Sequence, residues 1–343
     1  ENGWQLIGAC LSAADMTDQS TDITRLTAAA AESSDGRTSG LRLLDETGLL
    51  AVVLDVSGLA VEDRKPLEDK LRAALLAEPG VREVRIAMTA EKKSMTIVAV
   101  GSGKGGVGKS TLAANLAVAL QRRGIKVGLV DADIYGPSQP RLMDSEGVKP
   151  ESRGSKLVPV PNAYGVPMLS TGQIAAPGQA IAWRGPMAGK ALEQLVDASW
   201  GDIDTLIVDL PPGTGDVQLT MIQRHKPAGA VIVSTPQDLA LMDATRAISL
   251  FEQATVPIIG LVENMAGYAC PHCGEVSDPF GSGGAEAAAK TMGLDFLGRV
   301  PLSMGIRLAS DGGVPPAAGT DPMGEPFHAI AAKVADWLQA RKK

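Results

Sequence analysis

Two motifs in this chain of 343 residues combine residue types and spacings that suit known chemistry. Residues 103–110 (GKGGVGKS) fit the pattern G-x-x-x-x-G-K-[ST]. In that pattern backbone amides surround phosphate oxygens, the lysine reaches the β- and γ-phosphates, and the hydroxyl is a ligand for Mg²⁺. Residues 270–273 (CPHC) offer two thiolates. Such a pair binds zinc or an iron–sulfur cluster, or it acts as a redox pair.

The segments beside the glycine-rich loop predict the strand–loop–helix context of a phosphate site. Residues 96–100 form a continuous apolar run, and Leu112, Leu116 and Leu120 mark one face of a helix after the loop. The N-terminus of that helix adds about half a positive charge beside a bound phosphate. We therefore predict that the nucleotide phosphates contact Gly103, Lys104, Gly105, Gly106, Val107, Gly108, Lys109, Ser110 and Thr111.

Acidic residues follow two further apolar runs. Asp131 and Asp133 come after residues 127–130, and Asp209 ends the run 206–208. Because the carboxyl ends of parallel strands line the ligand crevice of an open α/β sheet, we expect these carboxylates near the phosphates. Asp209 has the Walker B form and is predicted to support Mg²⁺ together with Ser110.

Apolar runs without alternation recur after residue 94, at 96–100, 127–130, 205–208, 230–233 and 258–262. Runs of this kind suit strands that are buried on both faces, and most are followed by helical patterns. We predict a doubly wound, mostly parallel α/β P-loop NTPase domain over residues 94–343. Residues 144–186 are rich in proline and glycine and predict an insertion of short strands and loops.

A small α/β domain and a linker are predicted over residues 41–93. Residues 49–56 and 81–88 have strand patterns, and residues 66–76 have apolar side chains at helical spacing. Residues 1–40 show no convincing periodicity, so we predict a poorly defined segment or a short helix there. Cys10 is isolated in this segment, and we expect no ligand role for it.

Composition limits the classes of function. A net charge of −7 argues against nucleic-acid binding. No apolar run approaches the roughly 18 residues of a membrane span, and the first 30 residues do not resemble a signal peptide. Three cysteines do not make a disulfide framework, so a reducing, cytoplasmic location is expected.

The apolar side chains at helical spacing near the C-terminal end of the sequence have two interpretations. They are Phe327, Ile330, Val334, Trp337 and Leu338. A helix of this pattern, ending in basic residues, can lie on a membrane surface or pack on the sheet. We expect the packed helix and no stable membrane association.

The two lysines of the loop, Lys104 and Lys109, resemble the deviant Walker A motif of the MinD/ParA/nitrogenase-iron-protein group of dimerising P-loop ATPases. In that group the first lysine reaches the partner's nucleotide, which implies an ATP-linked homodimer. The resemblance also implies that Asp133 orients the attacking water and that Asp131 lies near the magnesium. Gly213 is expected to donate its N–H to the γ-phosphate, as switch II glycines do.

Other segments resemble the Mrp/ApbC family of iron–sulfur carrier ATPases over roughly residues 94–343. These are residues 133–138 (DIYGPS), 183–187 (WRGPM), 209–216 (DLPPGTGD), 263–265 (ENM) and the CxxC at 270–273. Residues 41–90 resemble the small N-terminal domain of bacterial members. The resemblance implies that Asn264 lies near the adenine and that Cys270 and Cys273 hold a cluster. It further implies apo-proteins and cluster donors as partners.

The ligand count at the CxxC predicts a second copy of the chain. Zinc and iron–sulfur clusters normally take four protein ligands, and the chain has one CxxC. Two copies related by a two-fold axis supply four thiolates. We predict a [4Fe–4S] cluster bridging two subunits through Cys270 and Cys273. A structural zinc with the same ligands and a redox pair stay open.

The predicted function is ATP-linked iron–sulfur cluster transfer, with slow hydrolysis because no arginine finger is recognisable. A spatial positioning ATPase of the MinD/ParA type, with a structural zinc at the CxxC, is the alternative. A redox ATPase like the nitrogenase iron protein takes its cysteines from two separate loops, which this chain lacks in the ATPase region. A metabolic kinase leaves Lys104 without a role.

Overall fold

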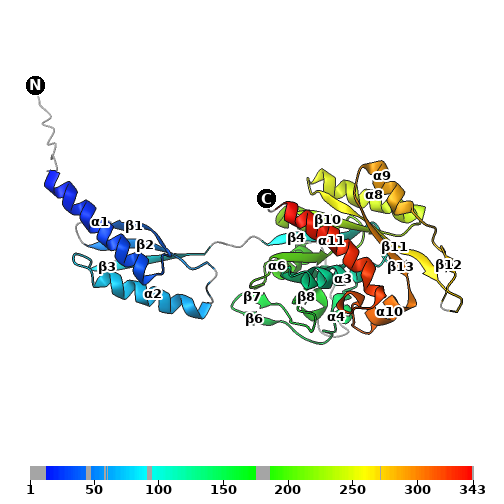
Figure 1. Ribbon diagram of the computed structural model, residues 1–343, viewed down its shortest axis with the longest axis horizontal. Helices are drawn as coiled ribbons and strands as arrows, with labels where there is room; N and C mark the ends of the chain where they lie inside the picture. The colour runs from blue at the N-terminus through cyan, green and yellow to red at the C-terminus, as the bar shows by residue number, and fades with distance from the viewer. Residues whose placement is uncertain are drawn as a thin grey trace, which may run out of the picture. The chain divides into compact units, whose positions relative to one another are not determined.

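The computed structural model describes residues 13–43, 48–57, 59, 61–90, 95–174, 186–270 and 272–341. The chain divides into two compact units, Glu1–Lys93 and Ser94–Lys343 (Figure 1). Several residues that the sequence analysis used lie outside the described parts. They are Cys10, residues 183–185, Pro271 and residues 342–343, the last two of the basic residues that follow the C-terminal apolar face.

The smaller unit is a three-stranded sheet covered by two helices. Its elements are α1 Ala13–Ser33, β1 Thr38–Leu43, β2 Leu49–Asp55, α2 Val61–Leu76 and β3 Glu83–Thr89. β2 lies in the middle, antiparallel to β1 and parallel to β3. Alternate β2 residues, Leu50, Val52 and Leu54, are buried against Leu71 and Leu75 of α2.

Helix α1 is longer than the short helix that the sequence predicts. Its 21 residues belong to the smaller unit, and Leu26 and Ala30 are buried in the core of that unit. Among residues 23–33 of this helix, Leu26 and Ala30 are the apolar side chains that are fully buried, and Ser33 is buried beside them. Two apolar residues give only a weak 3.6-residue period in the sequence.

The larger unit is built on a mostly parallel sheet, as predicted. Eight strands form it, in the order β12-β11-β10-β4-β9-β5-β8, with β13 beside β11. The strands are β4 Thr96–Ser102, β5 Val127–Asp131, β8 Met168–Ser170, β9 Thr205–Asp209, β10 Gly229–Ser234, β11 Ile258–Ala269, β12 Val276–Ser277 and β13 Phe296–Leu302. Among the strands named here, all within the described residues, β12 alone pairs antiparallel.

Helices and short strands connect these strands. They are α3 Lys109–Arg122, α4 Gln139–Leu142, β6 Glu151–Arg153, β7 Lys156–Val158, α5 Thr171–Ile174, α6 Pro186–Val196, α7 Asp216–Thr220, η1 Met221–His225, α8 Asp238–Gln253, α9 Gly284–Met292, α10 Met304–Asp311, η2 Pro316–Ala318, η3 Pro322–Gly324 and α11 Glu325–Ala340. The predicted insertion contains β6 and β7, which form a separate two-stranded sheet, and β8, which joins the edge of the main sheet.

Both faces of the main sheet are buried, which explains the continuous apolar runs. Along β4, Val98 and Val100 belong to a core shared with α3 and α11, whereas Ile97 and Ala99 belong to a second core beneath α6 and α8. Successive strand residues point to opposite faces. A strand covered on both sides therefore needs apolar residues at every position.

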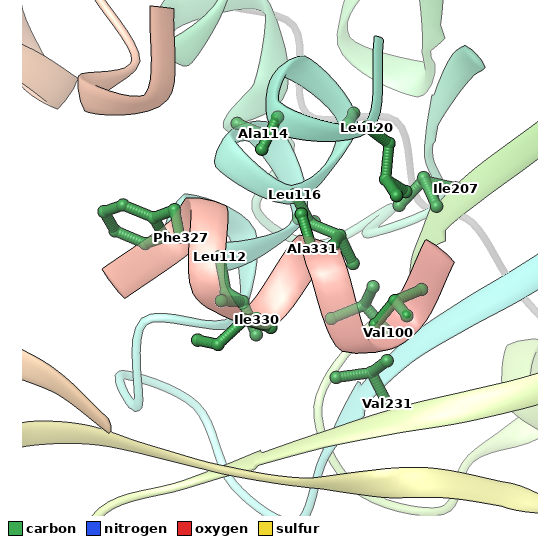
Figure 2. Close-up of a cluster of buried hydrophobic side chains, with 14 of the residues drawn as sticks. Val100, Leu112, Ala114, Leu116, Leu120, Ile207, Val231, Phe327, Ile330 and Ala331 are labelled. Carbon is green, nitrogen blue, oxygen red and sulfur yellow. The ribbon is translucent and has the colours of Figure 1, made fainter. Parts of the chain in front are cut away.

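The C-terminal helix packs on the sheet. Phe327, Ile330 and Leu338 are each at most 4% exposed. Figure 2 shows Ile330 and Ala331 of α11 among side chains of α3 and the strands. The apolar face of α11 is therefore used in the core. None of the helices in the described residues is long and apolar enough to cross a membrane.

Candidate functional site

The glycine-rich loop joins β4 to α3 and is shaped by positions that require glycine. A Cβ at Gly103 would lie 2.0 Å from the backbone of Asp243 in α8. Gly106 and Gly108 have φ of 80° and 82°, in the left-handed region. Gly108 is the N-cap of α3, so the loop leads directly to the helix N-terminus. The unpaired amides and the dipole there favour a phosphate.

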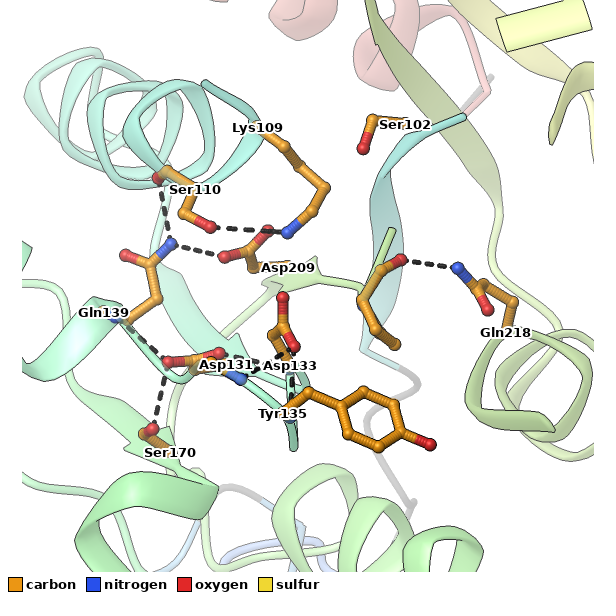
Figure 3. A network of polar contacts seen from close by, with 12 residues as sticks. Ser102, Lys109, Ser110, Asp131, Asp133, Tyr135, Gln139, Ser170, Asp209 and Gln218 are labelled. Carbon is orange, nitrogen blue, oxygen red and sulfur yellow. Dashed lines mark hydrogen bonds and ion pairs between the residues drawn. The ribbon is translucent and has the colours of Figure 1, made fainter. Parts of the chain in front are cut away.

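Lys109 turns from the start of α3 toward the end of β9. Its Nζ pairs with Oδ1 of Asp209, and also donates to Ser110 Oγ at 3.3 Å (Figure 3). The lysine side chain is 6% exposed and the aspartate is fully buried. The structure thus brings together three residues that sequence analysis assigned to the phosphates and magnesium.

Gln139, the first residue of α4, connects the same residues and was not predicted. Its Nε2 donates to Asp209 Oδ2 at 2.8 Å and to the Ser110 carbonyl at 2.9 Å. Its backbone N–H donates to Asp131 Oδ2 at 3.0 Å. Gln139 is fully buried. One glutamine in a proline-containing turn carries no sequence pattern, so only the fold reveals this role.

The two aspartates after β5 occupy different environments. Asp131 is fully buried and accepts from Ser170 Oγ at 3.0 Å, a partner that sequence analysis also missed. Asp133 is 9% exposed and lines the cavity at the glycine-rich loop. Its Oδ1 accepts the backbone N–H groups of Tyr135 and Gly136, both at 3.2 Å.

The buried position of Asp131 makes stability depend on pH. Burial, and then the charge of Asp209, raise the pKa of Asp131 from 3.8 to about 7. At a pH between these two values, Asp131 is protonated in the folded protein without nucleotide and is ionised in the unfolded chain. This stabilisation is complete below about pH 4 and is lost as the pH rises through about 7.

We expect the thermal midpoint of the nucleotide-free protein to fall between about pH 5 and about pH 8 more steeply than that of Asp131→Asn, which cannot titrate. Across this range the unfolding free energy of the wild type should fall by at most about 4 kcal/mol more than that of Asp131→Asn. Thermal melts of both proteins across this range measure it. Parallel curves for the two proteins would contradict the assignment to Asp131.

Two adjoining cavities follow the loop. A cavity of about 370 Å³ is lined by Lys104, Ser110 and Asp133. A second of about 230 Å³ is lined by Asn264, residues 300–303 and Phe327. Gly108 and Thr111 line both. One ligand with a phosphate end and a flat, partly apolar end can therefore span them.

Three further predicted residues contact or belong to the segment from Ser102 to Gly108. Asn264 Nδ2 donates to the Val107 carbonyl at 2.7 Å and so binds β11 to the loop. Lys104 is half-buried at the cavity wall, and no ion pair joins it to another described residue. Gly213 donates its N–H to the Ser102 carbonyl at 2.9 Å. In this structure the amide predicted for the γ-phosphate is thus bonded within the protein.

Cys270 and Cys273 lie at the tip of an exposed hairpin, where sequence analysis predicted a loop. β11 continues past Asn264 to Ala269, and β12 returns beside it. The Cys270 N–H donates to the Glu275 carbonyl at 2.9 Å, which closes the turn. Cys273 is exposed and Cys270 is half-buried.

The thiols of this hairpin suit metal binding. Backbone hydrogen bonds from Cys273, and then from His272, lower the pKa of Cys270, which favours the thiolate form that binds metals. Within the described residues no group of three or more His, Cys, Asp or Glu side chains is placed to hold a metal ion. The described part of one chain therefore supplies two thiolates and no third ligand.

Comparisons with known proteins identify similar chains. An iron–sulfur protein required for NADH dehydrogenase, mitochondrial, from Arabidopsis thaliana is 52% identical over 221 residues, which are 64% of this chain and 70% of that protein. An iron–sulfur cluster carrier protein of Escherichia coli strain K12 is 44% identical over 266 residues, 77% of this chain and 69% of that protein.

A solved structure extends the likeness to the fold. A nucleotide-binding protein from Archaeoglobus fulgidus, in complex with ADP and with Co, has a TM-score of 0.59 and 39% identity, and the match covers 68% of this chain and 91% of that one. The predicted P-loop NTPase fold and the resemblance to iron–sulfur carrier ATPases are confirmed. A family model described as ParA, NUBPL iron-transfer P-loop NTPase, matches residues 93–335. The chain therefore belongs to the NUBPL iron-transfer P-loop NTPase family.

Proposed function

We propose that this chain binds an iron–sulfur cluster, as cargo, and transfers it to apo-proteins under the control of ATP binding and hydrolysis. The exposed CxxC hairpin carries this proposal, because β11 leads directly from the nucleotide cavity to the two cysteines. A cluster at an exposed hairpin is accessible to an acceptor. The curated relatives named above include a carrier of iron–sulfur clusters.

The cargo site is completed by a homodimer. Two chains supply four thiolates, the usual number for a [4Fe–4S] cluster. Lys104, at the cavity wall without an ion pair in the described residues, is free to contact a partner's nucleotide. The CxxC, which needs two more thiolates, and Lys104, which is free to contact a partner's nucleotide, both favour a homodimer, although they lie at different sites.

The nucleotide site suits ATP with magnesium. Ser110, Asp131 and Asp209 offer only oxygen donors, as Mg²⁺ requires, and the proton that Asp131 binds in the nucleotide-free protein can leave when a cation binds. When bound, the ion neutralises charge on the phosphates. When ATP binds, Lys109 leaves Asp209 and contacts the phosphates instead. Asp133 orients the attacking water at the cavity wall. Asn264 contacts the base side.

A transfer assay tests this function. The protein is loaded with a cluster anaerobically and mixed with an apo-protein that needs a [4Fe–4S] cluster, in the presence of an iron chelator. We expect acceptor activity to appear, and its rate to change on adding ATP. A loaded protein that keeps its cluster under all nucleotide conditions would contradict the proposal.

The cytoplasmic location stays a prediction from cysteine usage.

A further inference from the structure

The segment after β9 is bonded to the glycine-rich loop in a way that must change when the γ-phosphate binds. Leu210 donates its N–H to Val100, and Gly213 donates its N–H to Ser102 at 2.9 Å. Ser102 is the last residue of β4, directly before the loop. The Gly213 amide cannot donate to a phosphate while it keeps this bond. A rearrangement limited to the bend formed by residues 210–213 is therefore needed.

Gln218 of α7 holds the bend from the other side. Its Nε2 donates to the carbonyls of Pro211 and Gly213, the latter at 2.7 Å. The residue is 2% exposed, and its Oε1 is buried without a hydrogen-bond partner among the described residues. Both amide hydrogens are used on the bend, so these two bonds set the orientation of the side chain.

The two bonds leave one peptide unit between them unrestrained by Gln218. The Pro211 carbonyl belongs to the peptide before Pro212, and the Gly213 carbonyl belongs to the peptide after Gly213. The Pro212–Gly213 peptide, which carries the Gly213 N–H, lies between these two. A peptide held at both neighbours rotates about its flanking bonds without moving the chain on either side.

Pro212 and Gly213 permit this rotation. Gly213 has a φ of 88°, and proline followed by a glycine at positive φ is the pattern at the centre of a type II turn. Rotation of the central peptide by about 180° converts a type II turn into a type I turn, in which proline keeps its φ and glycine takes a negative φ. The nearest atom to a Cβ at Gly213 is 4.0 Å away, so the bend has room.

We propose that the Pro212–Gly213 peptide flips when the γ-phosphate binds, and that Gln218 is the positioning residue that holds the neighbouring peptides during the flip. Before the flip the Gly213 N–H faces Ser102, and after it the N–H faces the phosphate. This inference rests on the proposed ATP-linked function. It assigns to Gln218 the selectivity of the site for ATP over ADP, since only ATP offers the third phosphate.

Paired affinities test the role of Gln218. Calorimetry with Mg²⁺ measures the Kd of ADP and of a non-hydrolysable ATP analogue for the wild type, Gln218→Leu and Gln218→Glu. Leu removes both donors at similar size, and Glu replaces them by oxygens. We expect either change to reduce the preference for the ATP analogue about tenfold or more, the scale of one hydrogen bond to a charged group, with ADP affinity unchanged. Gln223→Leu, at an exposed glutamine of η1, is the matched control.

The outcomes separate this inference from the proposed function. A merely structural Gln218 would weaken both nucleotides equally or leave both unchanged, and either result would overturn the inference. Failure of the wild type to bind ATP would overturn the proposed function together with it. If the variants do not fold, the wild type still decides by NMR with ¹⁵N-glycine. The Gly213 amide signal, assigned by its loss in Gly213→Ala, must shift with the ATP analogue and not with ADP. An equal response to both nucleotides would contradict the flip.

Discussion

Lys109→Met is expected to lower the thermal midpoint of the nucleotide-free protein by roughly 10 °C. The substitution leaves Asp209 fully buried without its cation, in a site that also holds the buried Asp131. Removal of one partner of a buried ion pair costs about 3–5 kcal/mol, because the other charge is left uncompensated. The variant should also lose ATP hydrolysis. Thermal melts and phosphate release measure the two effects.

Lys104→Met is the matched control, since it removes a lysine of the same loop. Lys104 is half-buried and has no ion pair within the described residues, so its loss should change stability by at most about 0.5 kcal/mol. Hydrolysis should nevertheless fall by about a hundredfold or more if Lys104 acts on the partner's nucleotide. The double variant Lys109→Met/Asp209→Asn should recover most of the lost midpoint and no activity. Equal midpoints for the two single variants would contradict the role of the Lys109–Asp209 pair.

Replacing Cys270 by alanine is expected to abolish stable cluster binding, although Cys273 remains. A dimer of this variant offers two thiolates instead of four, and the described residues contain no His, Cys, Asp or Glu group that could replace them. Iron content and visible absorption after anaerobic loading measure the loss. His272→Ala changes an exposed neighbour in the same hairpin and should load like the wild type. Full loading of the Cys270→Ala variant would place the cluster elsewhere in the chain.

The sequence predicted the parts of the site that depend on backbone shape. Gly103 and Gly108 are required because a Cβ would meet Asp243 or Asn264 at 2.0 Å, and such requirements appear directly as glycine spacing. The buried strands were predictable because a sheet covered on both faces needs apolar residues at every position. The family resemblance added Asn264, whose contact with Val107 joins residues 157 positions apart.

Hydrogen-bond partners were not predictable in the same way. Gln139 and Asp209 are 70 residues apart, and Lys109 and Asp209 are 100 apart. Nothing periodic marks a glutamine that will be buried beside a carboxylate, as Gln139 is, or beside backbone carbonyls, as Gln218 is. Both are found only when the fold places them. The bond between Gly213 and Ser102 was unexpected for a related reason. The motif indicates what the amide does with ATP, not what it does without it.

The stoichiometry of the loaded protein tests the central claim most directly. Native mass spectrometry after anaerobic loading, run beside Cys270→Ala, gives the number of chains and of iron and sulfide ions in each particle. The proposed function predicts two chains with one [4Fe–4S] cluster, and no cluster in the variant. A particle with one chain per cluster, or a dimer that retains zinc in place of iron, would contradict a cluster carried between two CxxC hairpins.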